Sequence, residues 1–257
     1  MPLAELHGKL SAEVRRSEDA LTGSAFNLLT LLPPDRCLLP WLNLAEDLAG
    51  TRIGLPARAE VAAAFWPQWK DGSGRDCEPD VVLSVQAGGT TVAVLIEVKY
   101  LSGLSGWPTS PHVSEMTGQL GREWQALQVV RDHELPGSPA TTSRRVIVYV
   151  TTDAQRPTAT LEASIQELAV KTDAAGANIF WLSWFTLSSV IESVGRESDL
   201  PVVERLALER LFALLASRRL VVFSGINPPV PVQIPWSYES GYLGTIQPVV
   251  IPWSYSS

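Results

Sequence analysis

Two apolar runs joined by a glycine turn, each with charged residues at one end, constrain the fold of this chain more than any other feature. The first run directly follows Asp80, and the second ends in Glu97, Val98 and Lys99. Because side chains alternate along a strand, Glu97 and Lys99 share one face of the sheet. Pairing of the two strands would bring Asp80, Glu97 and Lys99 together at the rim. Two carboxylates beside an ammonium suit a hard divalent cation that holds a water and a phosphate.

The bulk composition describes an ordinary globular protein with an excess of acidic residues. A length of 257 residues allows one large domain, or one domain with an appendage. The net charge of −7 counts against a broad nucleic-acid-binding face, which needs many Lys and Arg contacts to phosphates. It does not exclude a nuclease, because a metal ion reverses the local field. It suggests that a partner or a second subunit supplies much of any affinity for nucleic acid.

The cysteines and the hydropathy pattern predict a cytoplasmic, soluble protein. Cys37 and Cys77 are the only cysteines and lack a metal-type spacing, which indicates reduced thiols. The first residues lack a basic segment followed by an apolar one, so no secretory signal is expected. No run approaches the ~20 apolar residues of a membrane span.

The periodicity predicts an α/β sandwich with mixed sheet pairing, in the order α-β-β-β-α-β-α-β-α. A first helix begins at Ser17 and Glu18 and stops before Pro33. Helices are predicted over 114–132, 161–172, 186–195 and 201–217, with a shorter one within 35–57. Strands are predicted over 58–66, 145–151 and 178–184, besides the two of the hairpin.

The C-terminal residues 226–257 differ from the domain that precedes them at 1–225. Residues 231–238 and 248–255 are copies of one Pro/Trp-rich motif, identical at seven of eight positions. Three interpretations stay open for this tail. It could form extended arms packed on the domain, a docking element for a partner or second subunit, or a base-stacking element through Trp236 and Trp253.

The motif order resembles that of the PD-(D/E)XK nuclease superfamily, the restriction-endonuclease-like fold. Pro79-Asp80, a hairpin and Glu97-Val98-Lys99 match its signature, with the two acids 17 positions apart. Gln119, which opens the next helix, resembles the glutamine motif of the exonuclease-like branch. That branch places a tyrosine four or five residues on, where this chain has Trp124. The resemblance covers about residues 17–185 and implies an α-β-β-β-α-β core with a mixed sheet flanked by helices.

The resemblance implies a magnesium site at the strand ends, with Mn²⁺ able to substitute. Asp80 and Glu97 would bind the ion through carboxylate oxygens, and the carbonyl of Val98 would be a further ligand. Glu18, on the first helix, resembles the acidic residue that many members supply from that position. Acidic residues are also favoured in a first helical turn by the helix dipole alone, so Glu18 has two explanations.

Further residues have roles in substrate handling under the same resemblance. Lys99 would orient the attacking water or contact the scissile phosphate, and Gln119 would hold the water or a backbone oxygen. Arg122, one helical turn further, would clamp a phosphate. Glu60 on the first strand and His112 in the loop before the helix are lesser candidates.

The leading hypothesis is therefore a Mg²⁺-dependent nuclease that cleaves DNA phosphodiester bonds. The resemblance implies a setting in restriction, phage defence or DNA repair, with a homodimer or a partner protein. A catalytically degenerate nuclease fold that acts as a binding or scaffold subunit is the alternative, and RNA as the substrate also stays open. Glu97 and Lys99 could instead be a solvated ion pair worth under ~1 kcal/mol, but such a pair is unusual after five apolar residues.

Overall fold

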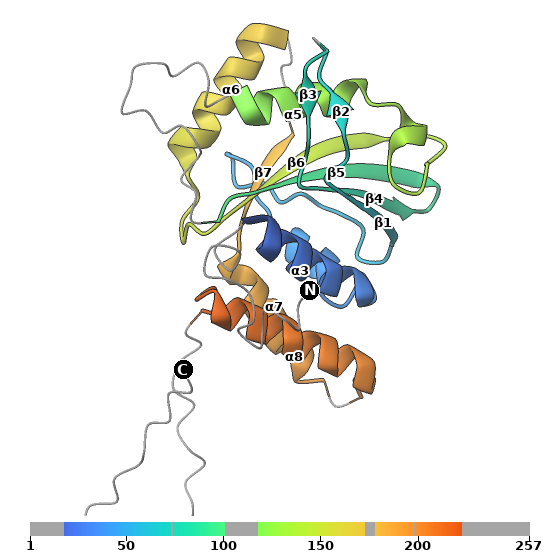
Figure 1. Cartoon of the computed structure of the whole chain (residues 1–257), viewed down its shortest axis with the longest axis vertical. Coiled ribbons are helices and arrows are strands. Elements are labelled where there is room, and N and C mark those ends of the chain that lie inside the picture. The colour runs from blue at the N-terminus through green and yellow to red at the C-terminus, as the bar shows by residue number, and fades with distance from the viewer. Residues whose placement is uncertain (1–17, 73, 101–117, 173–177, 198, 223–257) are drawn as a thin grey trace, which may run out of the picture. The chain divides into compact units, whose positions relative to one another are not determined.

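The protein is an α/β structure in which helices flank a five-stranded mixed sheet (Figure 1). The structure, a computed structural model, describes residues 18–72, 74–100, 118–172, 178–197 and 199–222. The sheet contains β1 (Glu60–Phe65), β4 (Val81–Ala87), β5 (Thr90–Val98), β6 (Arg144–Thr151) and β7 (Ile179–Ser183). The helices are α3 (Glu18–Leu31), α4 (Leu38–Leu42), α5 (Gly118–Val129), α6 (Thr158–Thr172), α7 (Phe185–Gly195) and α8 (Val202–Ser217), with a 3-10 turn η1 (Asp132–Glu134).

The strand order is β1-β4-β5-β6-β7, with antiparallel pairing up to β5 and parallel pairing after it. In the antiparallel part, β4 and β5 are joined by a tight turn in which Gly88 and Gly89 adopt φ of 56° and 77°. Such left-handed angles match the turns that suit the twist of paired strands. The parallel part needs crossover connections, and α5 and α6 lie in them. The predicted α/β class, with a mixed sheet flanked by helices, is therefore confirmed.

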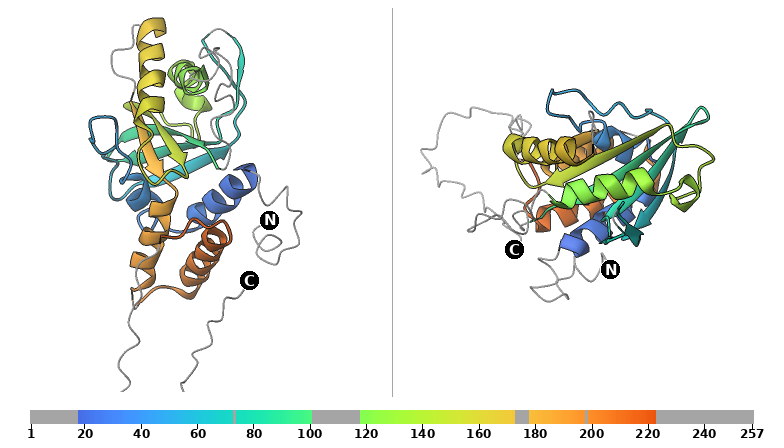
Figure 2. Two further views of the ribbon diagram at one scale, coloured as in Figure 1. Left: turned by 90° about the vertical axis from the view of Figure 1, so that its left-hand side faces the viewer. Right: turned by 90° about the horizontal axis from the view of Figure 1, so that it is seen from above.

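Each face of the sheet has its own layer of helices (Figures 1 and 2). The face with Val94, Ile96 and Val98 packs against α3, α4, α7 and α8. The opposite face, with Leu95 and Tyr149, packs against α5 and α6. Because both faces are covered, the central strands read as nearly continuous apolar runs.

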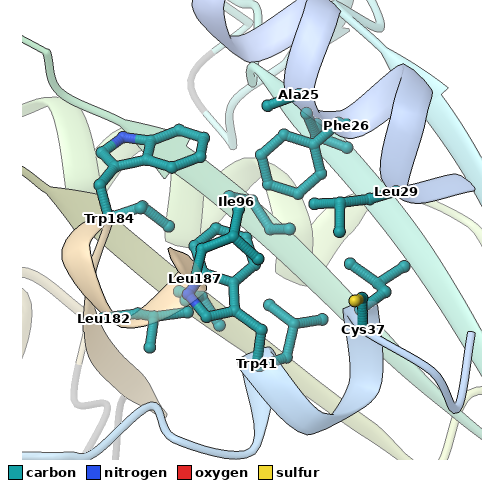
Figure 3. Packing of buried hydrophobic residues seen from close by; sticks show 14 of the residues in the cluster. Ala25, Phe26, Leu29, Cys37, Trp41, Ile96, Leu182, Trp184 and Leu187 are labelled. Carbon is teal, nitrogen blue, oxygen red and sulfur yellow. The ribbon is translucent and has the colours of Figure 1, made fainter. Parts of the chain in front are cut away.

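Three aromatic rings hold the α3 side of the core together (Figure 3). The rings of Trp41 and Trp184 lie 5.3 Å apart, and that of Phe26 lies 5.8 and 6.1 Å from them. All three residues are fully buried. Trp41 also donates a hydrogen bond from Nε1 to Thr186 Oγ1 at 3.0 Å. This packing fixes α3, the helix that carries Glu18 at its first position.

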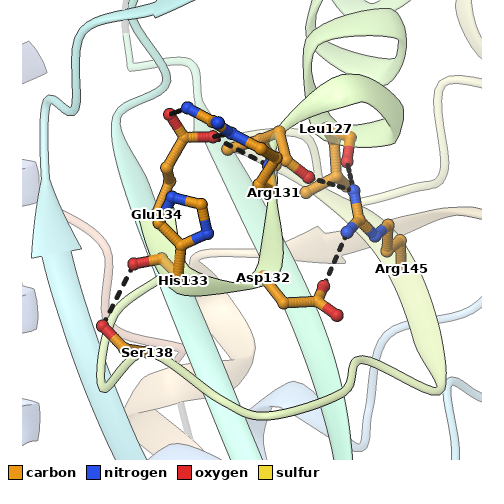
Figure 4. Close-up of polar contacts among 8 residues, drawn as sticks. Leu127, Arg131, Asp132, His133, Glu134, Ser138 and Arg145 are labelled. Carbon is orange, nitrogen blue, oxygen red and sulfur yellow. Dashed lines mark hydrogen bonds and ion pairs between the residues drawn. The ribbon is translucent and has the colours of Figure 1, made fainter.

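On the opposite face, Arg145 of β6 fastens the end of α5 (Figure 4). Its guanidinium donates to the carbonyl oxygens of Leu127 and Val130, the latter at 2.8 Å, and to Asp132 Oδ1 at 2.8 Å. These carbonyls are among the groups that a helix end leaves without intrahelical partners. These contacts hold the C-terminal end of α5 against the sheet. Gln119 lies at the N-terminal end of the same helix, so they also help to fix its position.

The structure differs from the sequence prediction mainly before the hairpin. A two-stranded ribbon, β2 (Trp69–Lys70) with β3 (Asp76–Cys77), was not predicted, because two-residue strands show no periodicity. The first strand begins at Glu60 rather than 58, and the last helix begins after Pro201.

The chain divides into two units, Met1–Phe223 and Ser224–Ser257, and the described residues all belong to the first. The predictions for the repeat tail, for Ser17 and for His112 fall on residues outside the described ranges. None of the helices in the described part of the chain is long and apolar enough to cross a membrane.

We expect Phe26→Ala to lower the free energy of unfolding by about 3–5 kcal/mol, because the change removes buried ring contacts and leaves a cavity. Leu31→Ala on the same helix is the control, since Leu31 is 70% exposed, and it should change stability by less than about 0.5 kcal/mol. Urea unfolding followed by tryptophan fluorescence measures both. Equal effects of the two substitutions would contradict the packing described for α3.

Candidate active site

The ends of β4 and β5 bring Asp80 and Glu97 to one rim of the sheet. Val81 pairs with Ile96, so the residues before and after these two partners lie at the same end of the strands. Asp80 Oδ2 accepts a hydrogen bond from the backbone N–H of Val98 at 2.8 Å. The hairpin register therefore brings the two acids to the same rim, and the hydrogen bond from Val98 fixes the Asp80 carboxyl group at the end of β5.

Glu97 is the centre of the site. Its Oε1 accepts hydrogen bonds from Lys99 Nζ at 2.5 Å and from Gln119 Nε2. Strand alternation places Lys99 on the same face, as predicted, and α5 supplies Gln119 from above that face. Glu97 is 2% exposed and Lys99 is 8% exposed, so this ion pair is buried rather than solvated.

Glu18 reaches the same ammonium from α3, on the other side of the sheet. Its Oε1 accepts from Lys99 Nζ at 3.2 Å, and its Oε2 accepts from the backbone N–H of Tyr100 at 2.7 Å. Both carboxylate oxygens thus have partners that orient the end of β5. In this arrangement Glu18 positions Lys99, and its predicted role as a metal ligand stays a prediction.

The structure adds one acid that the sequence analysis did not assign to the site. Glu123 lies one helical turn after Gln119, and the same Gln119 Nε2 donates to Glu123 Oε1 at 3.1 Å. The amide of Gln119 therefore bridges Glu97 and Glu123. The i,i+4 spacing from Gln119 was the signal that could have identified this residue. The aromatic next to it, Trp124, packs instead into the core beneath α5.

Two other sequence candidates lie outside this set of contacts. Arg122 is half-buried and donates from Nε to the carbonyl oxygen of Gly118 at 3.2 Å, so its role as a phosphate clamp stays a prediction. Glu60 pairs with Gln86, at the end of the sheet opposite Asp80. Its place on β1 gives it no part in the site.

Four acids surround one ammonium, and we call Glu18, Asp80, Glu97 and Glu123 the carboxylate cluster. Burial, and then the charge of Glu97, raises the pKa of Asp80 to about 8. Burial, and then the charge of Glu123, raises the pKa of Glu97 well above its ordinary value. Burial also raises the pKa of Glu123 to about 7. Although burial opposes the charge of Lys99, the carboxylate of Glu97 raises its pKa above the ordinary value.

The donors of the cluster suit a hard divalent cation, which prefers carboxylate and carbonyl oxygens. With all four acids ionised, the cluster and Lys99 would together carry −3 charges (four negative, one positive). Glu123 Oε2 is buried and has no hydrogen-bond partner among the described residues. No three His, Cys, Asp or Glu side chains in the described ranges are arranged as a ready ligand set. A complete coordination shell would therefore have to form on binding.

Comparisons of the chain with family models, with curated proteins and with solved structures each give no match. The function is therefore inferred from the geometry and chemistry of the site.

The raised pKa values give the metal-free protein a defined pH dependence. An acid whose folded-state pKa is raised binds more protons folded than unfolded, so folding stability falls as the pH rises between its two pKa values. For Glu123 this window runs from its ordinary value of 4.5 to about 7. In EDTA, we expect Glu123→Gln to gain about 1–3 kcal/mol of unfolding free energy relative to wild type between pH 4.5 and 7.5.

Urea unfolding at several pH values measures this difference. Glu162→Gln, at an exposed position of α6, is the matched control and should follow the wild-type pH profile. If the free energies of unfolding of Glu123→Gln and wild type differed by the same amount at every pH in the window, the raised pKa of Glu123 would be contradicted.

Proposed function

We propose that this chain is a metal-dependent nuclease that hydrolyses DNA phosphodiester bonds on a restriction-endonuclease-like core. The observation that carries the proposal is the burial of Asp80, Glu97 and Lys99 at the ends of two paired strands, where Lys99 bonds to Glu97 and Asp80 accepts from the backbone N–H of Val98. Burying an ion costs several kcal/mol, and well-packed apolar residues at these positions would stabilise the sheet at least as well. Buried acids with displaced pKa values are typical of catalytic sites.

The arrangement of elements supports the same proposal. A mixed sheet in which an antiparallel hairpin leads through α5 into a parallel strand agrees with the α-β-β-β-α-β core that the motif resemblance implies. The acidic motif lies at the end of the central strand β5, and the glutamine lies at the start of the following helix. These are the positions that the resemblance assigns to them.

The charges of the site explain why a cation would be required. A phosphodiester is anionic, and the carboxylate cluster would repel it. Asp80 and Glu97, with the carbonyl of Val98 and in the resemblance Glu18, would hold Mg²⁺ or Mn²⁺. Such an ion, when bound, would polarise the phosphate and lower the pKa of a coordinated water.

The protein's own groups would complete the chemistry. Lys99 keeps its ammonium charged because Glu97 stabilises it, and it would neutralise charge that develops on a phosphate oxygen. Gln119 holds Glu97 in place through its amide, a neutral group that adds no further charge. Arg122 would contact the nucleic acid backbone near the start of α5.

The partners and setting of this activity follow from charge and from the resemblance. A net charge of −7 leaves few phosphate contacts for the chain alone, so we propose that a second copy or a partner protein contributes to DNA binding. The cleavage of DNA would serve restriction, phage defence or DNA repair in the cytoplasm. RNA would be cleaved by the same machinery, and only a test of both substrates separates them.

A second candidate function is a nuclease-fold protein without catalysis that serves as a binding or scaffold subunit. One observation favours it: the side chains of the described residues do not form a ready ligand set for a metal ion.

A cleavage assay separates the two candidates. The full chain is incubated with circular, linear and single-stranded DNA and with RNA, in Mg²⁺, Mn²⁺ or EDTA. We expect cleavage that requires the metal. Glu97→Gln and Lys99→Met should each slow it by at least about 100-fold, because Glu97 would hold the metal ion and Lys99 would stabilise the charge that develops on the phosphate.

Two substitutions of the same residue types serve as controls. Glu60→Gln alters the opposite end of the sheet, and Lys70→Met alters a surface ammonium whose side chain is 67% exposed. Both should keep wild-type rates. Cleavage that survives Glu97→Gln would reject the assigned site, and nucleic acid binding without cleavage in any metal would support the scaffold function.

A further inference from the structure

Glu123 is a buried acid whose side chain lies within hydrogen-bonding reach of Glu97, and whose second oxygen accepts no hydrogen bond from the described residues. The residue is 2% exposed, and it lies on α5 with its Oε1 3.1 Å from Gln119 Nε2. Its Oε2 is shielded from solvent and accepts no hydrogen bond from any residue that the structure describes. Most buried polar atoms in proteins do have a partner, so an exception points to a group that completes the site.

The direction of the Glu123 carboxyl group is fixed by its neighbour. The single amide nitrogen of Gln119 donates to Oε1 of Glu123 and also to Oε1 of Glu97. Both carboxyl groups therefore meet at this nitrogen, and Glu123 faces the centre of the site rather than the core. Trp124, the next residue, takes the core-facing position on the helix.

No cationic side chain of the described residues forms an ion pair with Glu123, although the charge of Lys99 acts on it from a distance. The ammonium of Lys99 bonds to Glu97 and Glu18, and Arg122 directs its Nε to the carbonyl oxygen of Gly118. An ionised carboxylate in such a place is strongly destabilising unless a positive charge reaches it. A hard divalent cation supplies that charge and prefers oxygen ligands.

We infer that Glu123 is a further ligand of the divalent cation, which it would bind together with Asp80 and Glu97. The inference rests on the proposed function. It adds an acid from helix α5 to the two acids at the ends of β4 and β5. Gln119 then has a positioning role, since its amide holds Glu97 and Glu123 side by side. In this arrangement the ion is approached from the face of the sheet that α5 covers.

Binding of Mn²⁺ to the full chain, without nucleic acid, tests the inference. Free Mn²⁺ is measured by electron paramagnetic resonance at pH 7.5 for wild type, Glu123→Gln, Asp80→Asn and the exposed control Glu162→Gln. We expect Glu123→Gln to weaken binding by at least about tenfold and Asp80→Asn to weaken it at least as much. Glu162→Gln should match wild type.

The substitution Glu123→Gln keeps the shape of the side chain and removes a buried charge, so the metal-free variant should unfold at no lower urea concentration than wild type. Loss of Mn²⁺ affinity in a variant of undiminished stability would therefore reflect a lost ligand. Wild-type affinity in Glu123→Gln, with binding lost in Asp80→Asn, would overturn this inference and leave the proposed function standing. Failure of the wild-type chain to bind Mn²⁺ would overturn both.

Discussion

The buried contact between Glu97 and Lys99 is the interaction on which the organisation of the site depends. Lys99 Nζ bonds to Glu97 on its own strand and to Glu18 on α3, and Glu97 in turn bonds to Gln119 on α5. One ion pair at the end of β5 thus connects helices from both faces of the sheet. Elements far apart in sequence are held at one rim because their polar side chains have these partners and little contact with water.

The contacts of the site form only if α3 and α5 are held in fixed positions against the sheet. The aromatic packing of Phe26, Trp41 and Trp184 holds α3 on one face, and the bonds from Arg145 hold the end of α5 on the other. If either helix shifted, a buried carboxylate would lose its partner, at the full cost of desolvation. The apolar layers therefore contribute to function by fixing where the charged groups meet.

The sequence predicted the sheet and most of the site because strand alternation and hairpin register are local properties. Asp80, Glu97 and Lys99 were placed correctly from the apolar runs that precede or follow them. Glu123 was missed because the motif resemblance assigned Gln119 and Arg122 of this helix to the site and gave no role to the acid beside them. Its burial depends on how α5 packs over β5, and that packing is a tertiary property. The β2–β3 ribbon, which contains Cys77, was missed for a similar reason. Its strands are two residues long, so only their backbone pairing identifies them, and the sequence shows no alternation of apolar residues there.

The presence of Glu123 changes how the position after the glutamine is interpreted. In the resembling branch of nucleases an aromatic hydroxyl stands four or five residues after the glutamine, and the sequence suggested that Trp124 takes its place. The structure turns Trp124 into the core and gives the site-facing position to Glu123. A tyrosine hydroxyl could donate a hydrogen bond to the site, whereas a carboxylate offers negative charge and lone pairs. Under the proposed function, Glu123 therefore adds negative charge at a position where a hydroxyl would add none, and a bound cation would balance that charge.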